Sequence, residues 1–108
     1  MMTINELVDK SHTSAREKGF WGDPPTPLES MALVTSEISE AVEELRKVDP
    51  VWSWVPRSGK PEGVDIELAD AVIRIADFCG FHGIDLEFAI QAKMAYNKDR
   101  EFMHGKAK

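Results

Sequence analysis

The segment from Val64 to Cys79 constrains the fold more than any other, because its composition is helical and apolar on most sides. A helix that is hydrophobic nearly all round is buried by neighbouring elements. Ionised groups on a buried helix are costly unless they are paired or bind a metal ion. The polar residues of this helix nevertheless recur at steps of three, four and three, and so form one stripe: Glu67, Asp70, Arg74 and Asp77. The alternative is a solvated edge that Arg74 neutralises.

Three further helices are expected around this segment. Capping boxes at Thr3 and at Thr26 predict helices over residues 3–18 and 26–47. Asp85 caps a last helix over residues 86–102, and Gly80 and Gly83 mark a turn before it. No strand pattern appears. The predicted fold class is therefore all-α, a bundle of four to five helices.

The chain of 108 residues is expected to form one domain. Residues 1–25 hold the first helix and a Trp/Pro turn, residues 26–104 hold the main helices, and residues 105–108 form a basic tail. Four short helices cannot cover a helix that is apolar on so many sides, and exposing it would leave a large hydrophobic patch. We therefore expect oligomerisation to complete the bundle, as a homodimer or a dimer of dimers.

Two acidic pairs, Glu37-x-x-Glu40 and Glu67-x-x-Asp70, lie in two of the predicted helices. At three-residue spacing each pair shares one helix face, so two antiparallel helices can direct all four carboxylates to one point. Such a group of anions requires a cation. Carboxylate oxygens favour Mg²⁺, with Mn²⁺ as a second possibility, and these ions commonly act on phosphates.

Lys93, Asn97 and Arg100 share one face of the last predicted helix. An arginine forks onto paired oxygens and a lysine acts as a point charge, so this face is a candidate phosphate clamp. The simpler interpretation is that the two cations are solvated and favourably placed in the helix dipole.

The aromatic residues fall into two groups. Phe78, Phe88 and Tyr96 are expected in the core. The tryptophans lie in predicted loops, where either base stacking or packing at an interface would use them: Trp21, Trp52 and Trp54.

The formal net charge of −6 predicts repulsion of nucleic-acid polymers and of acidic membranes. No targeting segment or membrane span is apparent, and the single Cys79 fits a reducing compartment, so the sequence favours the cytoplasm. The three histidines have no zinc-binding spacing and are expected to be structural or on the surface.

The two acidic pairs, the stripe from Glu67 to Asp77 and the final Lys93-Met-Ala-Tyr-Asn97-Lys-Asp-Arg100 together resemble the MazG-like all-α nucleoside triphosphate pyrophosphohydrolases, in their short single-domain form. The resemblance covers about residues 28–106. It implies Mg²⁺-dependent hydrolysis of a (d)NTP to (d)NMP and pyrophosphate.

The resemblance also implies roles for individual residues. The metal ligands would be Glu37, Glu40, Glu67 and Asp70, and the phosphate-side residues would be Lys93, Asn97 and Arg100. Independently of the resemblance, phosphoryl transfer at such a site favours a carboxylate that orients the attacking water, and Glu40 and Glu44 are both candidates. Arg74 and Asp77 would support the ligands. The loop over residues 51–61 and the Phe20-Trp21-Gly22 turn are expected to form the base pocket. Two alternatives stay open: a related diphosphohydrolase acting on dUTP-like or modified nucleotides, and a non-catalytic helical interaction module.

Overall fold

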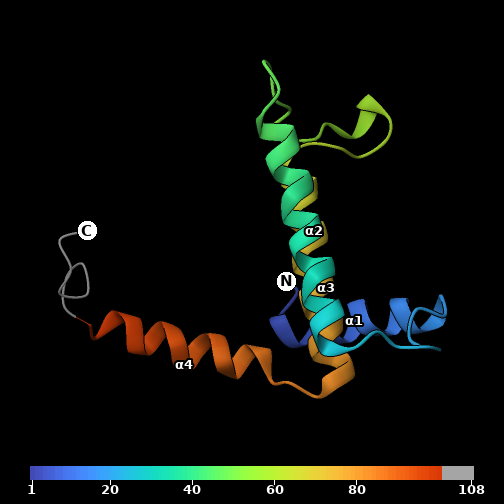
Figure 1. Cartoon of the computed structure of the whole chain (residues 1–108). Coiled ribbons are helices and arrows are strands. Elements are labelled where there is room, and N and C mark those ends of the chain that lie inside the picture. The colour runs from blue at the N-terminus through green and yellow to red at the C-terminus, as the bar shows by residue number, and fades with distance from the viewer. Residues whose placement is uncertain (101–108) are drawn as a thin grey trace.

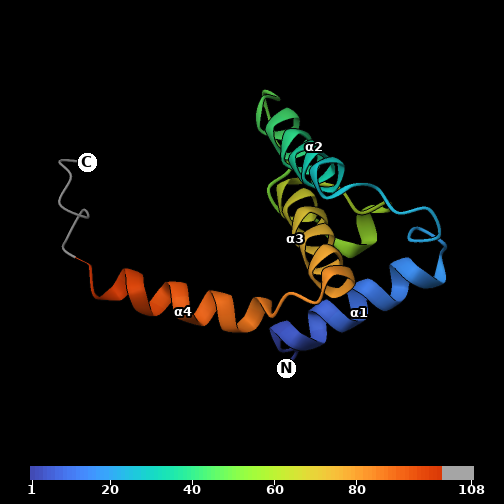
Figure 2. The same ribbon diagram turned by 60° about the horizontal axis from the view of Figure 1, so that its bottom comes forward.

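The computed structural model describes residues 1–100 and shows an all-helical chain (Figure 1). Within this range there is no strand, which confirms the predicted all-α class. The elements are α1 (Ile4–Glu17), α2 (Pro27–Leu45), the short 3₁₀ helix η1 (Pro56–Ser58), α3 (Val64–His82) and α4 (Leu86–Lys98). Helices α2 and α3 run antiparallel side by side (Figures 1 and 2). Helix α1 crosses the C-terminal half of α3, and α4 extends away from the other three helices.

The helix starts follow the predicted caps. Thr3 and Thr26 each form a complete capping box with the glutamate three residues later, and the Asp85 side chain accepts from the backbone N–H of Phe88. The helix ends differ more from expectation. Helix α2 ends at Leu45, and α4 ends at Lys98 rather than near residue 102. The basic tail predicted at residues 105–108 lies outside the described residues.

Helix α3 continues through Gly80 to His82, where the sequence predicted a turn. Gly80 lies against α1, where an added Cβ would be 2.5 Å from Cβ of His12. Gly80 therefore serves helix packing, while Gly83 ends the helix in the left-handed conformation at φ 69°.

The core lies where α1 crosses α3. Val8, Ala76 and Cys79 are buried there, and half-buried neighbours pack around them. Burial raises the pKa of the Cys79 thiol. Many large apolar side chains on α2 and α3 remain about half exposed, including Val42 and Val72. Such a small core leaves much apolar surface uncovered in one chain.

The predicted aromatic core is only partly correct. Phe78 is half-buried, but Phe88 is 65% exposed and Tyr96 is 60% exposed, because α4 leaves the body of the molecule after its first turn. That first turn is anchored: Leu86 packs against the core, and the backbone N–H of Asn5 donates to Glu87 Oε1 at 3.1 Å.

The connection between α2 and α3 is held at both ends. The Glu44 carboxylate accepts from the backbone N–H of Val51 at 2.7 Å, and the Asp65 carboxylate accepts from the backbone N–H of Trp54. Gly63 enters α3 at φ 131° and lies against Val51. The loop is thereby fixed to the start of α3.

None of the helices within residues 1–100 has the length and apolar composition that a membrane span requires.

Candidate functional site

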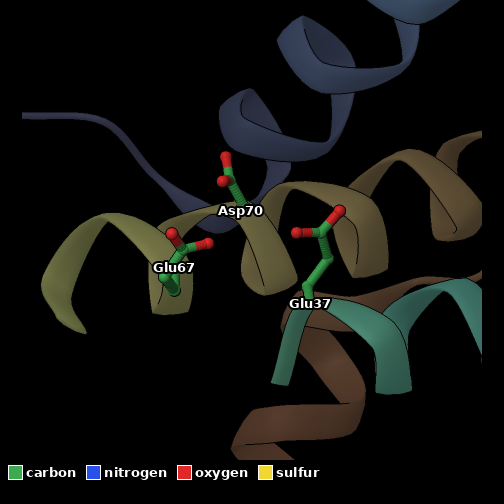
Figure 3. A group of neighbouring side chains, drawn as sticks. All are labelled: Glu37, Glu67 and Asp70. Carbon is green, nitrogen blue, oxygen red and sulfur yellow. The ribbon is translucent and has the colours of Figure 1, made fainter. Parts of the chain in front are cut away.

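Three of the four predicted metal ligands converge between α2 and α3. Each of Glu37, Glu67 and Asp70 offers a carboxylate oxygen, and these three oxygens all lie within 4.8 Å of one another. Figure 3 shows Glu67 and Asp70 projecting from neighbouring turns of α3 while Glu37 reaches toward them from α2. The three-residue spacing places the first two on one face of α3, and the antiparallel packing brings α2 opposite. We call these three residues the acidic cluster.

The acidic cluster concentrates negative charge. The pKa of Glu67 is raised, first by burial and then by the charges of Asp70, Glu40 and Glu37. One cation offsets this charge, because Arg74 donates from Nε to Oε2 of Glu37. Carboxylate oxygens that crowd together in this way are the kind of donor set that a hard divalent cation stabilises.

Glu40 and Glu44, the two candidates for orienting water, differ in their surroundings. Glu40 is exposed on α2, near enough for its charge to act on Glu67, and no hydrogen bond is seen at its carboxylate among residues 1–100. The carboxylate of Glu44 is buried and both its oxygens are engaged, Oε1 by Lys47 Nζ at 2.8 Å and Oε2 by the backbone N–H of Val51. These two bonds, Lys47 first, hold the pKa of Glu44 below its usual value. Both oxygens of Glu44 therefore serve to hold Lys47 and the loop at Val51.

Two adjoining cavities lie beside the acidic cluster. One, of about 240 Å³, is lined by Glu37 and Asp70 of the cluster. The other, of about 380 Å³, lies between the turn after α1, α2 and the end of α3. We call it the aromatic cavity because Phe20, Trp21 and Phe78 line it. Both cavities share the side chains of Phe20, Arg74 and Asp77, so they form adjacent parts of one surface.

Trp21 is fixed at the wall of the aromatic cavity. Its indole Nε1–H donates to Oδ1 of Asp77 at 2.7 Å, and its ring stacks on Phe81 with centroids 3.9 Å apart. His12 Nδ1 lies 3.0 Å from the same oxygen of Asp77. No sequence pattern marks His12 as functional, because its partner Asp77 is distant in the chain and only the packing of α1 on α3 joins them.

The other two predicted base-stacking residues are elsewhere. Trp52 and Trp54 are fixed near Asp65 at the start of α3, whereas Trp21 stacks on Phe81 near its end. These positions are separated by roughly 24 Å at about 1.5 Å per residue. The three tryptophans therefore do not lie in one pocket within a single chain. The loop and the Trp21 turn were expected to form a common base pocket, and within the chain they do not. Both ends of the loop contact the bundle at the start of α3, whereas Trp21 lies near the C-terminal end of that helix.

The predicted phosphate clamp is also separate from the acidic cluster within one chain. Lys93, Asn97 and Arg100 belong to α4 and the turn after it, which extend away from α2 and α3 (Figure 2). Lys93 and Arg100 lie over the ring of Tyr96, at 5.0 and 5.5 Å from its centroid. They would meet the acidic cluster of another copy of the chain if α4 packed against that copy.

No protein-family model, curated protein or solved structure matches this chain. Three converging carboxylates, an arginine beside them and an adjoining aromatic cavity offer a place for a cation, for a phosphate group and for a flat ring.

Proposed function

We propose that the protein is a Mg²⁺-dependent nucleoside triphosphate pyrophosphohydrolase of the MazG-like all-α type. The reaction would convert a (d)NTP and water to a (d)NMP and pyrophosphate. The observation that carries the proposal is the convergence of the Glu37, Glu67 and Asp70 oxygens within 4.8 Å, beside a cavity large enough for a base.

The acidic cluster fits a hard divalent cation. Its donors are all carboxylate oxygens from two helices. Burial first, and then the neighbouring carboxylate charges, raise the pKa of Glu67, and a bound cation would offset those charges. We assign Glu37, Glu67 and Asp70 as ligands of Mg²⁺ or Mn²⁺, with Glu40 as the fourth carboxylate of the set. When bound, the ion would neutralise phosphate charge and lower the barrier to attack by water.

The remaining roles follow from the positions of the side chains. Arg74 lines both cavities, and its planar guanidinium matches two phosphate oxygens. Glu40 has a carboxylate open to accept a proton or a hydrogen bond from water, which Glu44 lacks. We therefore assign the orientation of the attacking water to Glu40. Asp77 supports the site by holding Trp21 at the cavity wall.

A second copy of the chain completes this site in the proposal. The half-exposed apolar residues of α2 and α3 provide a surface for a homodimer or a dimer of dimers. Association would also allow Lys93, Asn97 and Arg100 from α4 of one protomer to approach the acidic cluster of its partner. The proposed location is the cytoplasm, where the single buried Cys79 stays a free thiol.

The decisive experiment incubates the full chain with each of the common NTPs and dNTPs in Mg²⁺, and separates pyrophosphate from orthophosphate by ³¹P NMR. We expect pyrophosphate and a nucleoside monophosphate, and no product when EDTA replaces Mg²⁺. Turnover confined to dUTP-like or modified nucleotides would favour the related diphosphohydrolase. Complete absence of turnover on every nucleotide would favour a non-catalytic module whose acidic surface binds a basic partner.

A further inference from the structure

The smaller cavity, of about 240 Å³, is lined by α1 as well as by α2 and α3. Two carboxylates of the acidic cluster, those of Glu37 and Asp70, belong to its lining. Figure 3 shows the Asp70 carboxylate pointing toward the ribbon of α1. The cavity thus joins α1 to the acidic cluster, a connection that no motif in the sequence predicts.

The side chains that α1 contributes share one face of the helix. They recur at steps of three, one and three, ending at the residue that caps the helix: Ser11, Ser14, Ala15 and Lys18. Three of these four residues carry a hydroxyl or an ammonium group. Both kinds of group donate hydrogen bonds, so this face offers donors to a ligand in the smaller cavity.

Ser11 is the buried polar residue of this face. The residue is only 8% exposed, and no hydrogen bond of its hydroxyl is seen among residues 1–100. Unlike the hydroxyl of Ser30, it is not fully enclosed, so it stays open to the cavity that Ser11 lines. A buried hydroxyl without a partner is unfavourable, and a bound ligand would satisfy it.

Lys18 and Arg74 are the two cations of the lining. Lys18 is exposed and forms no ion pair within residues 1–100. Arg74 uses Nε for its bond to Glu37, and within the same range no partner is seen for its two Nη groups. A guanidinium forks onto paired phosphate oxygens and an ammonium acts as a point charge, so the two cations together suit a phosphate group.

The charges around the smaller cavity set a condition on such a ligand. Three carboxylates line it, those of Glu37, Asp70 and Asp77, and they outnumber the two cations. A phosphate group alone would therefore meet a net negative charge. A divalent cation on the acidic cluster would reverse this balance, so the binding of an anion should depend on the metal ion.

We propose that α1 builds a phosphate subsite in the smaller cavity, in which Lys18, Ser11 and Ser14 bind a polyphosphate group beside Arg74. The ligand class is a polyphosphate in complex with a divalent cation. The subsite lies within one chain, so it does not need α4 of a partner. The identification of the polyphosphate as that of a nucleotide rests on the proposed function.

Lys18→Gln is the informative variant. It removes the charge of an exposed side chain, while the backbone bonds that end α1 at this residue can remain. Lys18→Arg keeps a cation and should rescue binding. The matched control is Lys10→Gln, because Lys10 is exposed on the same helix but lines a different cavity.

The test measures binding without turnover, by calorimetric titration of the full chain with inorganic pyrophosphate in Mg²⁺ or in EDTA. We expect the wild type to bind pyrophosphate in Mg²⁺ and not in EDTA. Lys18→Gln should weaken this binding roughly tenfold. Lys18→Arg and Lys10→Gln should stay within about twofold of the wild type. The rise in melting temperature that Mg²⁺ alone produces should persist in Lys18→Gln, because the carboxylates are intact.

Equal pyrophosphate affinity in Lys18→Gln and the wild type would overturn the proposal, and so would a wild type that binds no pyrophosphate in Mg²⁺. Binding that EDTA leaves unchanged would reject the dependence on the metal ion. An equal loss in Lys10→Gln would reduce the effect to the general charge of α1.

The outcome is separable from the proposed function. Pyrophosphate binding that depends on Lys18, without turnover of any nucleotide, would keep the subsite and reject the enzyme. Turnover of nucleotides with unchanged pyrophosphate affinity in Lys18→Gln would keep the enzyme and reject the subsite.

Discussion

Arg74 on α3 donates a hydrogen bond from Nε to Oε2 of Glu37 on α2, which joins the two helices that carry the acidic cluster. The pair is partly shielded, since the Glu37 side chain is 18% exposed. In the metal-free protein Arg74 thus acts as the counter-ion of Glu37, and a bound cation would take over part of that role.

Replacement of Arg74 by Met should destabilise the metal-free protein by about 1 kcal/mol, or roughly 4–8 °C in Tm, because Glu37 then faces the other carboxylates without a counter-charge. Mg²⁺ should restore part of this loss. Thermal melts with and without Mg²⁺ measure both effects. The control is Arg46→Met, which removes an exposed pair with Glu43 at 3.8 Å and should change Tm little. Equal losses in both variants would mean that the acidic cluster does not depend on Arg74.

Glu67→Gln should stabilise the metal-free protein at neutral pH. Burial and neighbouring charges raise the pKa of Glu67 in the folded state, so the folded protein holds this proton more tightly than the unfolded chain. The contribution of Glu67 to stability is therefore fully present below the unfolded pKa and is lost as pH rises through the folded pKa. Wild-type Tm should fall across the range just above the usual carboxyl pKa, and the fall should be smaller in Glu67→Gln.

The same variant should lose the stabilisation that Mg²⁺ gives to the wild type, because one ligand charge is missing. Melting curves at several pH values, each with Mg²⁺ or EDTA, separate the two effects. If Glu67→Gln melts below the wild type in EDTA at neutral pH, then burial and the neighbouring charges do not disfavour the ionised carboxylate of Glu67.

Glu37→Gln and Asp70→Asn should each abolish Mg²⁺-dependent release of pyrophosphate while the helical circular dichroism is retained. Each change removes a ligand charge and almost no volume. Glu43→Gln, on the exposed side of α2, is the matched control and should keep wild-type turnover. Wild-type rates in Glu37→Gln and Asp70→Asn would reject the acidic cluster as the metal site.

Much of the fold follows from local patterns in the sequence. The capping boxes at Thr3 and Thr26 act within a few residues, so they predict the helix starts well. The convergence of Glu37 with Glu67 and Asp70 was also predictable, because it needs only helix periodicity and one antiparallel pair. The local patterns do not predict the path of α4, and that path determines where Lys93 and Arg100 lie.

The aromatic cavity was the least predictable part of the site. The sequence marks Trp21 as a candidate, but His12, Ser30 and Phe81 join it only through the way α1 and α2 pack on α3. Gly80 shows the same limit. A glycine followed by a second glycine three residues later predicts a turn. In the structure Gly80 lies within α3 and allows His12 of α1 to approach, a contact with a residue far away in the sequence.

Gly80→Ala should destabilise the protein by about 1–3 kcal/mol, although alanine favours an isolated helix over glycine by about 1 kcal/mol. The added Cβ would lie 2.5 Å from Cβ of His12, so α1 must move away from α3. Urea denaturation measures the change. Gln91→Ala, exposed on α4, is the control and should be neutral or slightly stabilising. A stabilised Gly80→Ala would show that α1 does not pack closely on α3 in solution.

The protein should sediment as a dimer or a dimer of dimers, because α2 and α3 expose apolar residues such as Val42 and Val72 that a single chain leaves half uncovered. Val72→Asp should weaken the association. A stable monomer of 12.1 kDa at micromolar concentration would contradict the proposed assembly.

The same assembly predicts complementation between two inactive variants. Lys93→Ala damages the group that α4 would bring to a partner, and Asp70→Asn damages the acidic cluster, so neither homodimer should release pyrophosphate. In a mixed dimer both lesions fall in one site and the other site is intact. Unfolding and refolding an equal mixture should therefore recover about a quarter of wild-type turnover if protomers pair at random. If the mixture stays inactive although mass spectrometry shows mixed dimers, α4 does not serve the partner's acidic cluster.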